Sequence, residues 1–166
     1  MDLYLIRHGL AGQHGDYAND AERPLTDEGK CKTRQVAKQL HQLGLKFDLI
    51  LTSPLTRAKQ TAEILQAEGL SKQLEIADSL APGGELQQWL DWLVTWRAPN
   101  KVLALVGHEP NLSNWAETLV WGNAHGSLVL KKAGAIAVTI PDSGTPIATS
   151  RLFWLTPPRF LGGHEL

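Results

Sequence analysis

The sequence has little cysteine, no long apolar run and almost no net charge. Its single cysteine, Cys31, excludes a disulfide framework and a Cys-rich zinc site. No stretch approaches the roughly 18 apolar residues that a membrane span needs. The first residues also lack the basic and apolar regions of a secretory signal. We therefore expect a cytoplasmic protein with no membrane partner.

The charges of opposite sign nearly cancel. Sixteen Lys and Arg stand against seventeen Asp and Glu, which leaves a net charge of -1. Because the chain lacks an overall basic field, nucleic acid is not an expected partner. Any anion that the protein handles must be met by a few well-placed cations.

The length and the hydrophobic pattern indicate one layered domain. A chain of 166 residues matches a prior of about 150 residues per domain, so we expect a single domain over residues 1–166. Apolar runs typical of strands alternate with helical patterns, and two late strands form a hairpin-like pair. The alternation predicts an α/β fold, a three-layer α/β/α sandwich with a mostly parallel mixed sheet. The expected strands cover 3–6, 48–52, 74–77, 102–106, 135–140 and 147–155, and the expected helices cover 26–43, 53–65, 85–96 and a segment after residue 110.

Two of these helices carry recognisable start and stop signals. Thr26 is a predicted N-cap and Gly44 a predicted stop. The apolar face between them is expected to include Leu43 as its last member. Ser53 followed by Pro54 predicts an N-cap with proline at the first helical position.

Three clusters of Arg and His follow three of the predicted strands. Arg7 and His8 follow the first strand, Arg57 lies in the first turn after the second, and His108 follows the strand 102–106. Ligands of open α/β sheets bind at the carboxyl ends of strands, so these side chains should meet at one edge. Arginine forks match the oxygens of a phosphoryl group, and a neutral imidazole can attack phosphorus. The set predicts a phosphoryl-transfer site that needs neither a metal nor a cofactor.

Four segments in this order resemble the histidine phosphatase superfamily, whose fold is called phosphoglycerate-mutase-like. Residues 5–9 (LIRHG) resemble its RHG signature, and residues 23–29 (RPLTDEG) its LT-x-x-G segment. Residues 53–62 (SPLTRAKQTA) are similar to its second signature, and residues 106–110 (VGHEP) to its last catalytic-histidine segment. Among members of the superfamily, the short chain and the Gly-His-x-Pro sequence are most similar to the SixA type, which are phosphohistidine phosphatases of phosphorelay proteins.

The resemblance implies a role for each site residue. His8 would be the nucleophile and would pass through a phosphohistidine intermediate. Arg7 and Arg57 would hold the phosphoryl oxygens, and His108 would be the second histidine of the pocket. Arg23, in the matching LT-x-x-G segment, would reach the phosphate or an acidic group of the substrate.

The general acid of many family members has a poor counterpart in this sequence. Glu85 is the one carboxylate near the expected place, and it is also a plausible first-turn residue of a helix. An alkoxide leaving group needs a proton, whereas imidazole leaves readily because the pKa of imidazolium is about 6.5. A weak acid therefore favours a phosphohistidine phosphatase acting on a phosphorelay histidine domain. Two alternatives are a phosphatase or mutase for a small phosphorylated molecule, and a phosphate-recognising module without turnover.

Overall fold

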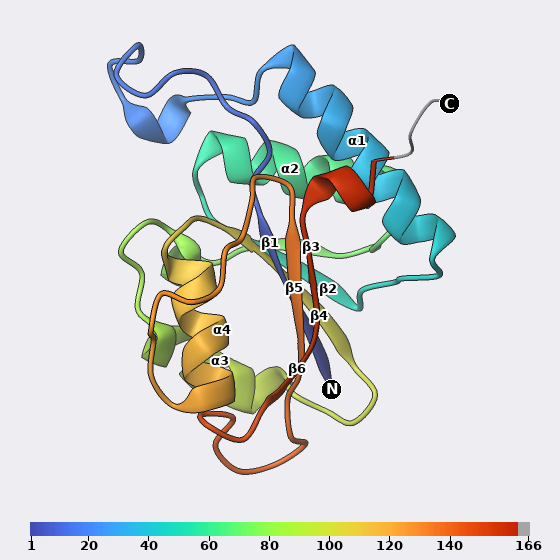
Figure 1. Cartoon of the computed structure of the whole chain (residues 1–166), viewed down its shortest axis with the longest axis vertical. Coiled ribbons are helices and arrows are strands. Elements are labelled where there is room, and N and C mark those ends of the chain that lie inside the picture. Colours follow the sequence, from blue (N-terminus) through green and yellow to red (C-terminus); the bar gives the residue numbers. More distant parts are fainter. Residues whose placement is uncertain (163–166) are drawn as a thin grey trace.

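A mixed sheet of six strands forms the centre of the computed structural model, which describes residues 1–162 (Figure 1). The strand order is β3-β2-β4-β1-β5-β6. Strands β3, β2, β4 and β1 pair in parallel, and β5 is antiparallel to both of its neighbours. The mostly parallel mixed sheet predicted from the sequence is therefore confirmed. The strands are β1 (Asp2–Arg7), β2 (Leu49–Thr52), β3 (Leu74–Ile76), β4 (Val102–Gly107), β5 (Ala135–Thr139) and β6 (Arg151–Thr156).

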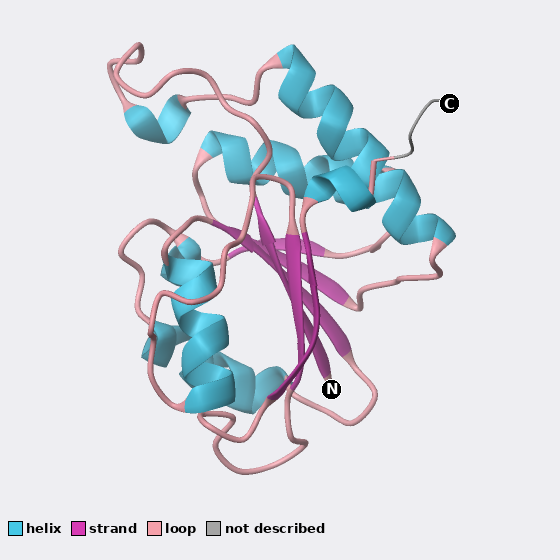
Figure 2. Cartoon of the chain, in the orientation of Figure 1, coloured by secondary structure: helices cyan, strands magenta, loops and turns pink. Residues whose placement is uncertain are grey.

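Helices cover both faces of this sheet, which confirms the three-layer sandwich (Figure 2). Helices α1 (Asp27–Gln42) and α2 (Thr56–Ala67) lie on one face, and α3 (Leu86–Trp96) and α4 (Asn111–Trp121) lie on the other. Three short 3-10 turns complete the described elements: η1 (Asp20–Glu22), η2 (Asp78–Leu80) and η3 (Pro158–Phe160). None of the helices within residues 1–162 has the length and apolar character that a membrane crossing requires.

Alternation along the central strands builds two separate cores. In β1, Leu3 and Leu5 face α3 and α4 and pack in the cluster that contains Trp89. Tyr4 and Ile6 point the opposite way and join the cluster under α1 and α2. Successive side chains of a strand point to opposite faces, so a strand covered on both sides must be apolar throughout. The continuous apolar run of the first strand is explained by this double burial.

The predicted ends of α1 are present, but its apolar face is shorter than expected. The Thr26 hydroxyl oxygen accepts a hydrogen bond from the Gly29 N–H at 2.9 Å, and Gly44 has a φ of 82° just beyond the helix. The expectation for Leu43 is wrong, because this side chain is 55% exposed. Leu43 is the C-cap residue, where the chain leaves the helix and the 3.6-residue pattern no longer places side chains.

The predicted N-cap at Ser53 is also wrong. Helix α2 begins at Thr56, and its N-cap is Leu55, which makes no side-chain capping bond. The Ser53 hydroxyl oxygen instead accepts a hydrogen bond from the Leu55 N–H at 3.2 Å and lies 2.7 Å from Nε2 of His108. The Ser53 hydroxyl therefore contacts His108, a residue distant in the sequence, instead of capping α2.

The last strand starts later than its apolar pattern indicates. The expected strand begins at residue 147, whereas β6 begins at Arg151. Residues 147–149 form a turn in which Ala148 has a φ of 58°. The Ser150 hydroxyl donates to the Pro146 carbonyl at 2.7 Å. This local hydrogen bond competes with strand pairing, so β6 begins only after Ser150.

Gly29 lets the loop after β1 lie directly against α1. A Cβ atom at Gly29 would lie 2.0 Å from the Leu10 carbonyl oxygen, a backbone atom that cannot rotate away. We expect Gly29→Ala to lower the free energy of unfolding by about 2 kcal/mol or more, as overpacking does in cores. Urea denaturation measures the loss. Gly162→Ala is the matched control, because its Cβ would meet no atom closer than 3.5 Å. Equal stability of the two variants would contradict the close approach.

Candidate active site

Parallel pairing brings the predicted clusters to one edge of the sheet. Arg7, at the end of β1, is paired with Gly107 at the end of β4. The N–H of His8 donates to the Gly107 carbonyl at 3.1 Å, and the N–H of Ser53 donates to the Val106 carbonyl at 2.9 Å. As a result the ring centroids of His8 and His108 lie 5.2 Å apart.

The backbone around His8 selects one form of its ring. Nδ1 of His8 lies 2.7 Å from the carbonyl oxygen of Gly9. A carbonyl oxygen only accepts, so Nδ1 must donate its proton and the lone pair of the neutral ring lies on Nε2. The Gly9 N–H donates to the Thr61 hydroxyl at 3.0 Å, and the Ala133 N–H donates to the His8 carbonyl at 3.2 Å. These bonds fix the backbone of His8 and Gly9, from which the ring projects.

His108 is oriented by Ser53, which the sequence did not point out as a site residue. Nε2 of His108 lies 2.7 Å from the Ser53 hydroxyl, and both residues are buried. The other ring nitrogen, Nδ1, is buried without a hydrogen-bond partner among the described residues. Ser53 stands at the head of the segment 53–62, and this position is the signal that could have identified it.

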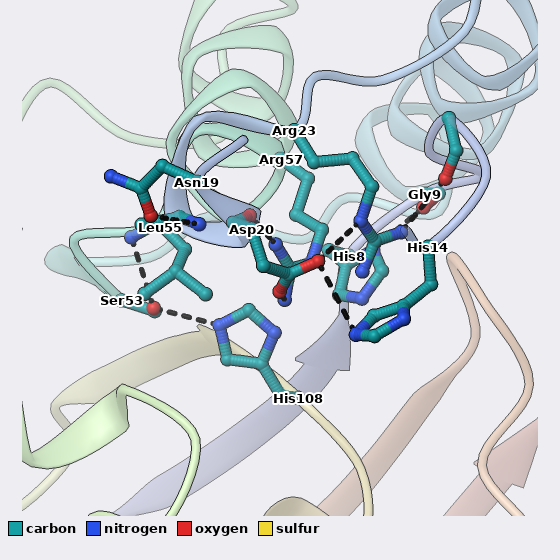
Figure 3. A network of polar contacts seen from close by, with 12 residues as sticks. His8, Gly9, His14, Asn19, Asp20, Arg23, Ser53, Leu55, Arg57 and His108 are labelled. Atoms are coloured by element: carbon teal, nitrogen blue, oxygen red, sulfur yellow. Dashed lines mark hydrogen bonds and ion pairs between the residues drawn. The ribbon is translucent and has the colours of Figure 1, made fainter. Parts of the chain in front are cut away.

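Asp20 lies between two arginines and joins them into a network (Figure 3). Nη2 of Arg57 donates to one carboxylate oxygen of Asp20 at 3.1 Å, and Nε of Arg23 donates to the other at 2.8 Å. The Arg57 Nη1 also donates to the Asp20 backbone carbonyl at 2.9 Å. His14, on the same loop, lies 3.8 Å from the Asp20 carboxylate. Asp20 is not among the site residues predicted from the sequence, because an acidic residue in a polar loop carries no pattern of its own.

Several polar atoms of this site have no hydrogen-bond partner among the described residues. Nη1 of Arg7 donates to the Leu130 carbonyl at 3.0 Å, yet its Nε is buried and unpartnered, as is Nε of Arg57. Together with Nδ1 of His108, these atoms make up three of the five such buried side-chain atoms within residues 1–162. Buried polar groups are normally hydrogen-bonded, and exceptions need an explanation. An anion that accepts hydrogen bonds from all three nitrogens would explain these exceptions.

Burial and positive charge keep both histidines neutral. Burial lowers the pKa of His8 to about 3, and the charges of Arg57 and Arg7 add to this effect. Burial also lowers the pKa of His108 to about 4, again with help from Arg57. The hydrogen bond from Arg23 lowers the pKa of Asp20, so this carboxyl stays ionised. Near neutral pH the site therefore combines arginine cations with uncharged imidazoles.

Glu85 takes no part in this network. It is exposed and occupies the N-cap position of α3, without a side-chain capping bond. Within residues 1–162 it makes no hydrogen bond or ion pair with either histidine. Over the same residues, no three His, Cys, Asp or Glu side chains cluster in a way that would hold a metal ion.

Comparisons with known proteins show what this chain is similar to. The sequence pattern of the histidine phosphatase superfamily (branch 1) matches residues 3–82. The phosphohistidine phosphatase SixA of Escherichia coli (strain K12) is 33% identical over 87 residues, which are 52% of this chain and 53% of SixA. The chain belongs to the histidine phosphatase superfamily.

A solved structure and a full-length relative extend the match beyond these segments. The structure of SixA complexed with tungstate superimposes with a TM-score of 0.84 at 25% identity, covering 97% of this chain and 99% of SixA. An uncharacterized protein of Picosynechococcus sp. is 47% identical over 163 residues, covering 97% of this chain and 99% of the relative. The fold is therefore that of SixA, and these similarities support a phosphatase enzyme.

The low pKa values of the two site histidines predict a pH-dependent stability. Unfolded histidine has a pKa of about 6.5, whereas the folded values are about 3 and about 4. As the pH drops below about 6.5, both histidines take up protons in the unfolded state before they do so in the folded state. The free energy of unfolding therefore falls as the pH drops. From about pH 7 to about pH 5, the expected loss is about 2 kcal/mol for each histidine.

The measurement is urea denaturation across this pH range, in buffer free of phosphate. His108→Gln should remove about half of the extra pH dependence, because it deletes one of the two buried imidazoles. His41→Gln removes an exposed histidine instead and serves as the control. If the free energy of unfolding of His108→Gln depended on pH as steeply as that of the parent, the His108 ring would not be buried in its neutral form.

Proposed function

We propose that this protein is a metal-independent phosphatase that removes phosphate from phosphohistidine on a protein of a phosphorelay. The observation that carries the proposal is the pair of buried imidazoles of His8 and His108, 5.2 Å apart, on which the charges of Arg7 and Arg57 act. Nε of Arg7, Nε of Arg57 and Nδ1 of His108 are buried without a partner among residues 1–162, and we assign them to a bound phosphoryl group. The similarity to SixA supports the choice of phosphohistidine.

The reaction would proceed in two steps through His8. Nε2 of His8 attacks phosphorus, and the bond between phosphorus and the substrate nitrogen breaks. The electron pair of that bond goes to the substrate imidazole, which leaves as the neutral or protonated ring. Water then attacks the phosphorus on His8, which releases inorganic phosphate and restores the neutral imidazole.

Each neighbouring group has a role that its geometry supports. The forks of Arg7 and Arg57 hold the equatorial oxygens, where phosphoryl transfer concentrates its charge. Ser53 accepts from the Leu55 N–H, so its own proton is available for Nε2 of His108. The Nδ1 of His108 then carries a proton and donates it towards the phosphoryl oxygens. We place Arg23 at the rim of the site. When substrate binds, Arg23 leaves Asp20 and pairs with an acidic group of the substrate.

The carboxyl group of this network, Asp20, stays ionised because its pKa is lowered by Arg23, so it holds no proton for a leaving group, which favours an imidazole leaving group. Glu85 is exposed and is not joined to the histidines, so we assign it to the start of α3 rather than to proton donation. A positioned acid typically contributes about 10²- to 10⁴-fold to a reaction that needs one. An ester would lose this factor here, whereas phosphohistidine would lose little.

The test compares phosphohistidine and phosphoserine in peptides of one sequence. We expect kcat/KM to be at least about 10²-fold higher for phosphohistidine, because a serine alkoxide must be protonated as it leaves. His8→Asn should lower turnover by about 10³-fold or more and should abolish acid-labile phosphate on the enzyme. Faster turnover of phosphoserine or of a small phosphoester would assign the protein to the alternative class. Phosphate binding without any turnover would make it a recognition module.

Asp20 provides a second test, because substrate phosphate must compete with its carboxylate for Arg57 and Arg23. Asp20→Asn keeps the shape and removes the charge. We expect inorganic phosphate to inhibit this variant more strongly than the parent, with an inhibition constant up to about threefold lower. The change is small because a partly exposed ion pair is weak. The inhibition constant of phosphate is the measurement, and Asp16→Asn, in the same exposed loop, is the control. Weaker inhibition would mean that Asp20 positions the arginines instead.

A further inference from the structure

A basic and apolar groove continues outward from the phosphate site. Its cavity has a volume of about 730 Å³, and Arg7 lines it at one end. Residues of η3, which follows β6 and lies near the same end of the sheet (Figure 1), also line it. The N–H of Ala133, also in the lining, donates to the backbone carbonyls of Arg7 and His8 at 3.0 and 3.2 Å. The groove is therefore built onto the residues that hold the site.

The groove is far more basic than the protein as a whole. Lys32, Lys131, Lys132 and Arg159 line it together with Arg7, and among residues 1–162 its lining contains no carboxylate. Lys32 is paired with Glu28, whereas the other three outer cations form no ion pair within residues 1–162. The chain carries a net charge of only -1, so this concentration of positive charge is local. Such a patch selects and steers acidic partners.

Apolar side chains lie exposed between these cations. Val129 is 62% exposed, Leu155 is 40% exposed and Phe160 is 69% exposed, and all three line the groove. A phosphoryl group alone needs none of this surface. Exposed apolar patches rimmed by charge mark binding sites for proteins or ligands, and a volume of this size holds several side chains.

The wall that carries Lys131 is held in place before any partner binds. The Glu117 carboxylate, fully buried in α4, accepts from four consecutive backbone N–H groups at residues 125–128. The Leu130 carbonyl then accepts from Arg7 at 3.0 Å. Ordering of a loop costs binding energy, so a preformed wall favours recognition.

We propose that this groove docks an acidic, amphipathic segment of the phosphoprotein substrate, beside its phosphohistidine. The inference rests on the proposed function, because it places a protein next to the phosphoryl group. Acidic side chains of the segment meet Lys131, Lys132 and Arg159, and apolar side chains cover Val129 and Leu155. Single-stranded nucleic acid would instead need a series of aromatic rings for stacking. Among the described residues the lining has one aromatic side chain, Phe160, and the Arg159 guanidinium already lies over its ring at 4.9 Å.

Binding of unphosphorylated peptides tests the groove without relying on turnover. One peptide carries Glu and Asp on one side of a central His and Leu and Val on the other. Its neutral counterpart has Gln and Asn in place of Glu and Asp. We expect the parent to bind the acidic peptide at least about tenfold more tightly at low salt. Fluorescence anisotropy measures both dissociation constants.

The double variant Lys131→Glu with Arg159→Glu should weaken binding of the acidic peptide by about tenfold or more. The control, Lys46→Glu with Lys72→Glu, makes the same charge change at exposed positions that line a different cavity. Equal binding of both peptides, or equal losses in the two double variants, would overturn the proposal. A single-stranded oligonucleotide that binds more tightly than the acidic peptide, with the same dependence on Lys131 and Arg159, would overturn it in favour of nucleic acid.

Turnover of the phosphorylated peptides separates this inference from the proposed function. If both hold, the ratio of kcat/KM for the acidic over the neutral phosphohistidine peptide should fall in the Lys131 and Arg159 double variant and not in the control. Selective binding without turnover of phosphohistidine would refute the proposed function and leave the groove standing. Turnover with no preference for the acidic peptide would refute the groove alone.

Discussion

The parallel register of β1 against β4 is the constraint on which the rest of the site depends. It pairs Arg7 with Gly107, so the residues that follow both strands leave the sheet at the same height. His8 and His108, a hundred positions apart in the chain, come within 5.2 Å between ring centroids. A shift of one residue would turn the side chains of β1 to the opposite face, and both cores would be lost together with the site.

Charge around the histidines is balanced in an unusual way. The arginines stay cationic beside two imidazoles that burial keeps neutral. A neutral ring retains the lone pair that a nucleophile needs, and neighbouring cations make protonation of that ring costly. The same electrostatics that suit the site to an anion therefore keep His8 neutral, as the proposed attack on phosphorus requires, while Asp20 partly neutralises Arg57 and Arg23.

Tight backbone contacts hold this arrangement. Gly29 allows the Leu10 carbonyl to lie against α1, and Gly9 passes so close to α1 that a Cβ atom there would lie 2.3 Å from the Thr33 hydroxyl. The Gly9 N–H is bonded to α2 through Thr61. The segment after β1 is thus fixed by both helices on that face, which gives the backbone of His8 and Gly9 little freedom to move. Such preorganisation is what electrostatic stabilisation of a phosphoryl group requires.

Much of the fold and part of the site follow from the sequence by itself. Double burial of the central strands demands continuous apolar runs, and the caps of α1 are local hydrogen bonds, so both are visible in the order of residues. The positions of Arg7, His8, Arg57 and His108, at or shortly after the ends of strands, predict that they meet, since carboxyl ends of parallel strands share an edge. Tertiary structure alone decided the partners of Ser53 and Asp20. Each makes contacts with residues more than thirty positions away, and such contacts depend on how the layers pack and leave no periodic trace in the chain.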